Sequence, residues 1–250
     1  MPLYDFLVAV SEVRPLIELI GKGSLRRRSL TEAGFDAALL QPATAGSIVL
    51  IVGRFEQFMK DIGNKALDQY GRANPPLGRS SLSLPLQVKI LSANISAAAR
   101  RKEYGVTVAD VDRIREIDRV ANNIAEDKVW GDNAIETFSN PNSSTVQSIL
   151  NLLGVPTPWL LLEAEFAGHW ASVRTSEPQF KAIPHAQNEL DSILTWRNGI
   201  AHTNTLPSVG HKELIETAAF FECLARAIDD VLQNHVNSVI SAAGSSFAPW

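Results

Sequence analysis

The helical spacing of apolar side chains along almost the whole chain is the feature that most limits how it can fold. Over residues 211–243 apolar side chains recur every three or four positions, which is the period of one face of an α-helix. The same period marks residues 3–20, 45–70 and 107–124, whereas no segment shows a convincing alternation of apolar and polar residues. The sequence therefore predicts an all-α protein of roughly seven or eight helices.

Glycine, proline and serine indicate where several of these helices begin and end. The first helix is predicted to end at Gly21 and Gly23, because glycine disfavours a helix interior. A short separate segment is expected over residues 35–39, before the helix of residues 45–70. Residues 71–84 are rich in proline, glycine and serine and are predicted to form a surface loop.

Composition excludes several classes of protein. The single cysteine, Cys223, lies in an apolar stretch and is predicted to be a core residue, and no Cys/His cluster has zinc spacing. The most apolar run, residues 47–53, is too short to span a bilayer, and no signal peptide is recognised. The net charge of −4 argues against a protein that coats nucleic acid non-specifically. We therefore expect a cytoplasmic protein with no membrane role, metal or cofactor, in which any RNA contact is local.

One hexapeptide carries groups suited to phosphodiester chemistry. Arg197 supplies a fixed cation, Asn198 a hydrogen-bonding amide, and His202 a group that titrates near neutral pH. On a regular helix, Arg197 falls within an apolar sector that includes Leu190 and Leu194. An unpaired guanidinium in a sealed core is very unfavourable, so Arg197 is expected to face a cleft, a buried acid or a subunit interface.

The spacing within this hexapeptide raises a geometric difficulty. His202 lies about 140° around a regular helix from Arg197, which is too far for both side chains to meet one phosphate easily. Gly199 weakens a helix by about 1 kcal/mol relative to alanine, so we expect the backbone to kink or end there and bring the two residues together. An arginine and a histidine at a helix end also serve simply to bind the last carbonyl groups, and spacing alone leaves both interpretations open.

Residues 190–202 resemble the signature of the HEPN superfamily, an apolar helix that ends in arginine, a polar residue and then histidine. Residues 47–58, with Glu56 after an apolar run, resemble the early helix of that superfamily. Residues 142–154 resemble the segment before the motif helix in the branch that carries a ribosomal-L-PSP label. The resemblance implies a HEPN-type helical bundle with additional helices, within a single all-α domain over residues 1–250.

The resemblance also implies how that domain is organised. We expect a HEPN-like core over about residues 45–243 and an N-terminal helical extension over residues 1–44. The helices expected between Thr107 and Ile183 are additions to the simplest form of the family.

The same resemblance implies a metal-independent endoribonuclease that acts as a homodimer with a composite active site. His202 would act as general base or acid for attack of the ribose 2′-hydroxyl, which leaves a 2′,3′-cyclic phosphate. Arg197 would bind the phosphate, Asn198 would orient the phosphate or His202, and Glu56 would hold Arg197 or His202 in place. The cellular role expected is that of a toxin, antiphage or stress-response effector, with an antitoxin or other regulatory protein as a partner.

A second interpretation is a non-catalytic HEPN module that binds RNA, a nucleotide or a protein partner. Both interpretations accommodate the acidic net charge. The complete set of Arg197, Asn198 and His202 favours the enzyme, because a scaffold has no chemical need for all three.

Overall fold

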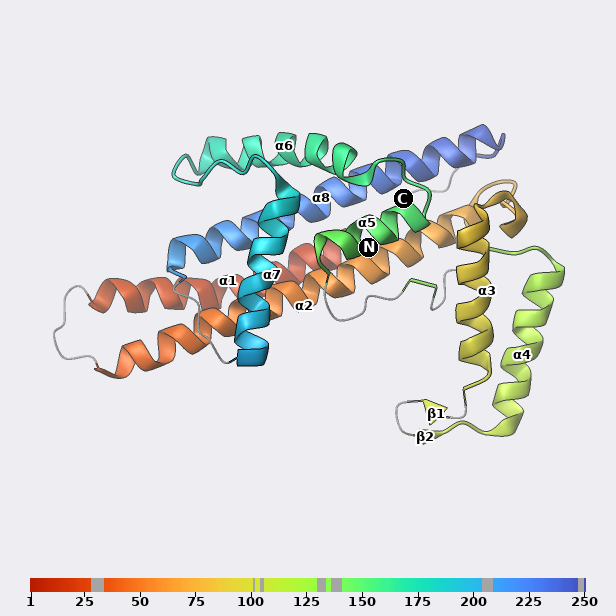
Figure 1. The fold of residues 1–250 in the computed structure, drawn as a ribbon, viewed down its shortest axis with the longest axis horizontal. Coiled ribbons are helices and arrows are strands. Elements are labelled where there is room, and N and C mark those ends of the chain that lie inside the picture. Colours follow the sequence, from red (N-terminus) through yellow and green to blue (C-terminus); the bar gives the residue numbers. More distant parts are fainter. Residues whose placement is uncertain are drawn as a thin grey trace. The chain divides into compact units, whose positions relative to one another are not determined.

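The computed structural model describes residues 1–27, 34–100, 102–103, 106–129, 134–135, 141–203, 209–246 and 250. Within these residues the fold is all-α, as predicted, with eight α-helices (Figure 1). The helices are α1 (Pro2–Arg27), α2 (Gly34–Arg72), α3 (Leu84–Ala98), α4 (Asp110–Ala125), α5 (Ser143–Leu152), α6 (Pro158–Ser176), α7 (Ala186–Thr203) and α8 (His211–Ala242). A single 3-10 turn, η1 (Arg79–Ser81), precedes α3.

Two predicted helix boundaries are wrong. Helix α1 continues through Gly21 and Gly23 to Arg27, and residues 35–39 belong to α2 rather than to a separate segment. A glycine costs a helix only about 1 kcal/mol, which is too little to end a helix by itself. Pro42 lies inside α2, and Thr44 and Ala45, two and three positions after it, are buried. Burial of that kind stabilises a helix beyond what its local sequence indicates.

The chain divides into two compact units, which are described separately. Unit 1 comprises residues 1–59, 137–147 and 157–231, and unit 2 comprises residues 60–136, 148–156 and 232–250. Helices α2 and α8 contribute residues to both units. The single domain with a core over about residues 45–243 stays a prediction.

Aromatic side chains connect four segments of unit 1. Phe6 of α1 packs against Phe55 of α2, with ring centroids 6.1 Å apart, and Phe55 packs against Phe221 of α8 at 5.0 Å. Phe166 of α6 lies 5.4 Å from Phe220 of α8. Aromatic pairs at such distances contribute about 0.5–1.5 kcal/mol beyond the burial of their area. This cluster holds α1, α2, α6 and α8 of unit 1 together.

Unit 2 is closed by contacts between segments far apart in the sequence. Asn74 and Ser246 exchange two backbone hydrogen bonds, with N–O distances of 2.8 and 2.9 Å. Tyr70 is buried, and burial raises the pKa of its phenol to about 12.

Helices α3 and α4 lie side by side and are joined through a short antiparallel hairpin of β1 (Lys102–Glu103) and β2 (Val106–Thr107) (Figure 1). This hairpin is the small exception to an otherwise helical fold in the described part of the chain.

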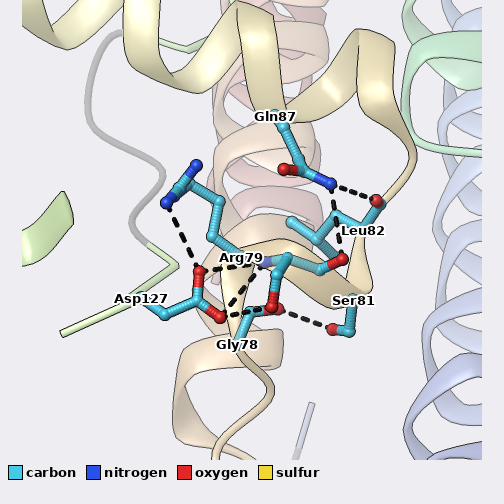
Figure 2. A network of polar contacts seen from close by, with 7 residues as sticks. Gly78, Arg79, Ser81, Leu82, Gln87 and Asp127 are labelled. Carbon is cyan, nitrogen blue, oxygen red and sulfur yellow. Dashed lines mark hydrogen bonds and ion pairs between the residues drawn. The ribbon is translucent and has the colours of Figure 1, made fainter. Parts of the chain in front are cut away.

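A polar network around Asp127, which follows the end of α4, fixes the turn before α3 (Figure 2). The Asp127 carboxylate accepts hydrogen bonds from the backbone N–H of Ser80, at 3.0 Å, and from the Ser80 hydroxyl. The Arg79 guanidinium lies 3.4 Å from the same carboxylate, and the Arg79 backbone N–H donates to the Asp127 carbonyl at 2.7 Å. The hydroxyl hydrogen bond contributes most to lowering the pKa of Asp127, and the Ser80 N–H and the Arg79 charge lower it further.

Two backbone features adapt the chain to this network. Asp127 has a φ of +52°, a left-handed conformation that aspartate tolerates better than most residues. Gly78 leaves room for the carboxylate, because a Cβ at this position would lie 2.3 Å from Asp127 Oδ2. The network is therefore built from side chains and backbone groups of unit 2 itself.

Candidate active site

Helix α7 carries the candidate hexapeptide, and its N-terminal end is firmly held within unit 1. The Glu163 carboxylate of α6 accepts hydrogen bonds from the backbone N–H groups of Ala186, at 2.9 Å, and Gln187, at 3.0 Å. The first N–H groups of a helix have no partner within that helix, so Glu163 acts as a cap supplied by another helix. The negative charge also complements the positive end of the helix dipole.

A second contact attaches α7 to the start of α5. The Asp191 carboxylate accepts hydrogen bonds from the backbone N–H and the hydroxyl of Ser143, at 2.9 and 2.6 Å. The indole of Trp159 donates to the Ser143 carbonyl at 3.1 Å. Because Trp159 belongs to α6, these contacts join α5, α6 and α7 around one serine.

The burial of α7 changes along its length. Leu190, Ile193 and Leu194 are buried, whereas Trp196 and Ile200 are only half-buried although they lie in the same apolar sector. The apolar sector of α7 therefore extends beyond the part that this chain buries. The candidate hexapeptide occupies this less covered end.

The structure brings Arg197 and Asn198 together. Both side chains are half-buried, and Arg197 Nη1 donates a hydrogen bond of 3.2 Å to Asn198 Oδ1. His202 is exposed. Among the contacts of the described residues, none joins Arg197 or Asn198 to His202. Arg197 is thus only partly shielded by its own chain, and its amide neighbour holds the guanidinium.

The predicted change of direction at Gly199 finds no support. Helix α7 runs through Gly199 to Thr203 without interruption (Figure 1). On a continuous helix Arg197 and His202 stay about 140° apart, whereas Asn198 and His202 share a face. A Cβ built at Gly199 would meet no atom within 4 Å, so no close neighbour in the described chain requires glycine here.

Glu56 lies in the part of α2 that belongs to unit 1, and its side chain is half-buried. It is already engaged in an interaction within the structure. Its role in holding Arg197 or His202 stays a prediction.

Other nucleophilic or titratable groups lie in contacts that stabilise the fold. Cys223 is buried, as predicted, and burial raises the pKa of its thiol to about 11. His235 Nε2 lies 3.1 Å from the Leu153 carbonyl, and burial lowers the pKa of this imidazole. His169 pairs with Asp230 at 2.8 Å between α6 and α8. The described residues contain no group of three or more metal-ligating side chains.

Sequence reasoning missed the residues that position α7. Glu163 and Asp191 cap helix ends to which they are not adjacent in sequence, so only the fold reveals their partners. It also missed a cavity beside Trp196, whose other walls come from Lys181 and Glu216. The one sequence signal for this cavity is that Glu189 and Trp196, seven positions apart, share a face of α7.

The fold and the comparison of sequences define the class of protein. The profile of the RiboL-PSP-HEPN family matches residues 29–234, and the chain belongs to this family. It is thus an all-α HEPN protein, and HEPN domains often act as ribonucleases, bind RNA and work as dimers. No curated protein and no solved structure gives a significant match. None of the helices in the described ranges has the length and apolarity needed to cross a bilayer.

Proposed function

We propose that this chain is a metal-independent HEPN endoribonuclease whose active site is the C-terminal half of α7. The observation that carries the proposal is the position of Arg197, half-buried on an apolar sector that its own chain covers only in part. Within one chain its described hydrogen-bond partner is the neutral amide of Asn198. The guanidinium therefore keeps its charge for an anionic ligand, and family membership favours RNA as that ligand.

The residues of α7 suit a transesterification that needs only proton transfer and charge stabilisation. His202 removes the proton of the ribose 2′-hydroxyl, and the resulting oxygen attacks the adjacent phosphorus. The bond to the 5′-oxygen breaks, and the proton that His202 took up is returned to that oxygen as it leaves. The products are a 2′,3′-cyclic phosphate and a 5′-hydroxyl. Arg197 stabilises the negative charge that develops on the phosphate, and Asn198 positions Arg197 through its hydrogen bond.

The proposed site is completed by a second copy of the chain. On a continuous α7 the side chains of Arg197 and His202 diverge, which argues that Arg197 of one chain works with His202 of another. The half-buried Ile200 and the open space at Gly199 are suited to the approach of a second α7. In the cell we expect a toxin, antiphage or stress-response effector that a regulatory protein such as an antitoxin restrains.

RNA cleavage by matched variants tests this proposal. Purified wild-type protein, Arg197→Ala and His202→Ala are incubated with total RNA in the presence of a chelator. Ser192→Ala, an exposed residue of the same helix, is the control. We expect cleavage by the wild type and the control, with cyclic phosphate ends, and loss of cleavage in the other two. Cleavage that persists in both variants would overturn the site assignment.

The alternative, a non-catalytic HEPN module, gives a different result in the same experiment. All four proteins would then be equally inactive while remaining folded and dimeric. RNA retained by the wild type in a binding assay, without products, would identify the ligand of such a module.

A further inference from the structure

A cavity of about 220 Å³ in unit 1 lies beside the helix that carries the candidate active site. Trp196 and Glu189 of α7 form one wall, Lys212 and Glu216 of α8 form another, and Lys181 of the connection between α6 and α7 also contributes. This volume is below the range typical of pockets for drug-sized ligands, so it suits a group of one or two rings.

One pair of opposite charges around the cavity is balanced within the protein. The Lys181 ammonium lies 2.8 and 2.9 Å from the two oxygens of the Glu189 carboxylate. Glu213, in the first turn of α8, lies where the positive end of the helix dipole stabilises a carboxylate. The groups that we assign to a ligand are the carboxylate of Glu216 and the ammonium of Lys212. Because the lining holds three carboxylates and two ammonium groups, it carries one surplus negative charge and favours a ligand that donates hydrogen bonds.

Glu216 is an unusual residue for this position because its side chain is buried. It is 6% exposed, and its Oε1 accepts a hydrogen bond of 2.6 Å from the backbone N–H of Lys181. Its Oε2 has no hydrogen-bond partner among the described residues. This oxygen is not sealed from solvent, so a ligand in the cavity that donates a hydrogen bond can take the place of water there.

We propose that this cavity binds a nucleobase that bears an exocyclic amino group. The half-buried indole of Trp196 offers a flat face for stacking, Glu216 accepts a hydrogen bond from the amino group, and Lys212 donates to a ring nitrogen or carbonyl. Uracil has no amino group. Its only ring N–H donor lies between two carbonyl oxygens, and these oxygens would be repelled by the Glu216 carboxylate. A phosphate is excluded from the same position, because the buried Glu216 charge repels it.

The inference rests on the proposed function, because the base would belong to the RNA that Arg197 holds. Trp196 directly precedes Arg197, and the two side chains leave α7 about 100° apart. Around the helix, Arg197 lies between Trp196 and the face shared by Asn198 and His202. A base stacked on Trp196 therefore belongs to a nucleotide beside the cleaved phosphate, and the enzyme is predicted to disfavour uridine at that position.

Nucleotide binding followed by NMR tests the cavity independently of cleavage. The full chain has five tryptophans, and the indole N–H signal of Trp196 is identified as the one missing in Trp196→Phe. Adenosine, cytidine, guanosine and uridine monophosphates are titrated against the wild type. We expect the Trp196 signal to shift with the first three and to require about tenfold more uridine monophosphate, the cost of losing a hydrogen bond to a charged group.

Glu216→Gln sharpens the test, because the amide keeps an acceptor for the Lys181 N–H but replaces the carboxylate charge. This variant should lose most of the discrimination against uridine, whereas Glu165→Gln, an exposed residue of α6, should keep it. Thermal unfolding checks that both variants are folded, and Lys212→Ala, an exposed residue, should weaken binding of all three favoured nucleotides.

Equal shifts with all four nucleotides, or no saturable shift of the Trp196 signal, would overturn the inference. The two proposals fail separately. A protein that cleaves RNA without discriminating nucleotides refutes only the cavity, whereas one that discriminates nucleotides without cleaving RNA refutes only the ribonuclease.

Discussion

The network around Asp127 and the C-terminal end of α7 both bring an arginine close to polar side chains, yet they use it differently. In the network, Ser80 donates hydrogen bonds to the Asp127 carboxylate and the Arg79 guanidinium faces it, so the two opposite charges balance although Arg79 Nε has no hydrogen-bond partner among the described residues (Figure 2). At the end of α7, Arg197 binds the neutral amide of Asn198 and keeps its full charge. The first cluster thus stabilises the fold, and the second is the one that we propose for a ligand.

Shifts of pKa alone would point to the Asp127 network rather than to the end of α7. The pKa of Asp127 is lowered by its hydrogen bonds and by Arg79, and shifted groups are often taken as signs of catalysis. Structural ion pairs shift pKa values by the same physics. Whether a charged group retains capacity for a ligand is the better guide in this protein.

Loss of RNA cleavage should distinguish the end of α7 from the Asp127 network. Arg197→Ala and His202→Ala should each lower the rate of RNA cleavage by at least about 100-fold, because each removes a group that acts in the transition state. Neither should change the free energy of unfolding by more than about 0.5 kcal/mol, since His202 is exposed and Arg197 is half-buried. Cleavage assays measure the rate, and urea unfolding measures the free energy of unfolding. A large loss of stability in both variants would indicate that Arg197 and His202 stabilise the fold.

The opposite result is expected at Gly78. Gly78→Ala places a Cβ 2.3 Å from Asp127 Oδ2, while the backbone φ of −73° suits alanine. The clash should therefore lower the free energy of unfolding by about 1–3 kcal/mol, as overpacking does. Urea unfolding measures this change, and cleavage at a temperature where the variant is folded should match the wild type. An unchanged stability would show that the network adjusts freely.

A smaller effect tests how α7 is held. Glu163→Ala removes the cap of the first N–H groups of α7 and should cost about 1 kcal/mol of stability. Glu163→Gln keeps an acceptor and should cost less. Unfolding in urea compares the two variants. Equal losses would mean that the charge of Glu163, rather than its hydrogen bonds, stabilises the helix.

The smallest effect is the dependence of stability on acid. The pKa of Asp127 is lower in the folded chain than in the unfolded chain, so its contribution is present above the unfolded pKa and is lost as the pH falls through the folded value. The urea midpoint of the wild type should decline below about pH 4. Asp127→Asn should remove part of this decline, whereas Asp118→Asn, an exposed residue of α4, should leave it unchanged. A decline that is identical in all three proteins would show that Asp127 does not contribute.

The helical period predicted the class of fold because a helix that buries one face needs apolar side chains every three or four positions. The same period predicted the extent of α8, whereas the proline, glycine and serine residues of 71–84 predicted the loop after α2. The C-terminal end of α1 and the start of α2 could not be predicted, since packing along the whole helix can offset the local cost of Gly21 or Pro42.

The candidate residues were identified by their chemistry and by resemblance, but their arrangement was not. Spacing gave the angle between Arg197 and His202 correctly for a regular helix, and the error was to expect Gly199 to break that helix. Contacts such as Glu163 to Ala186, or Glu216 to Lys181, join residues more than 20 positions apart and depend on how the helices pack. They could not be predicted from a single sequence.

We propose that the site at the end of α7 is incomplete in one chain and is completed by another. Mixing Arg197→Ala with His202→Ala, after exchange of subunits, tests this composite site. A mixed dimer contains one site with both groups intact, so the inactive variants should together recover about a quarter of the wild-type cleavage rate. Recovery that requires mixing would support the composite site, whereas a mixture as inactive as its components, with mixed dimers shown to form, would contradict it.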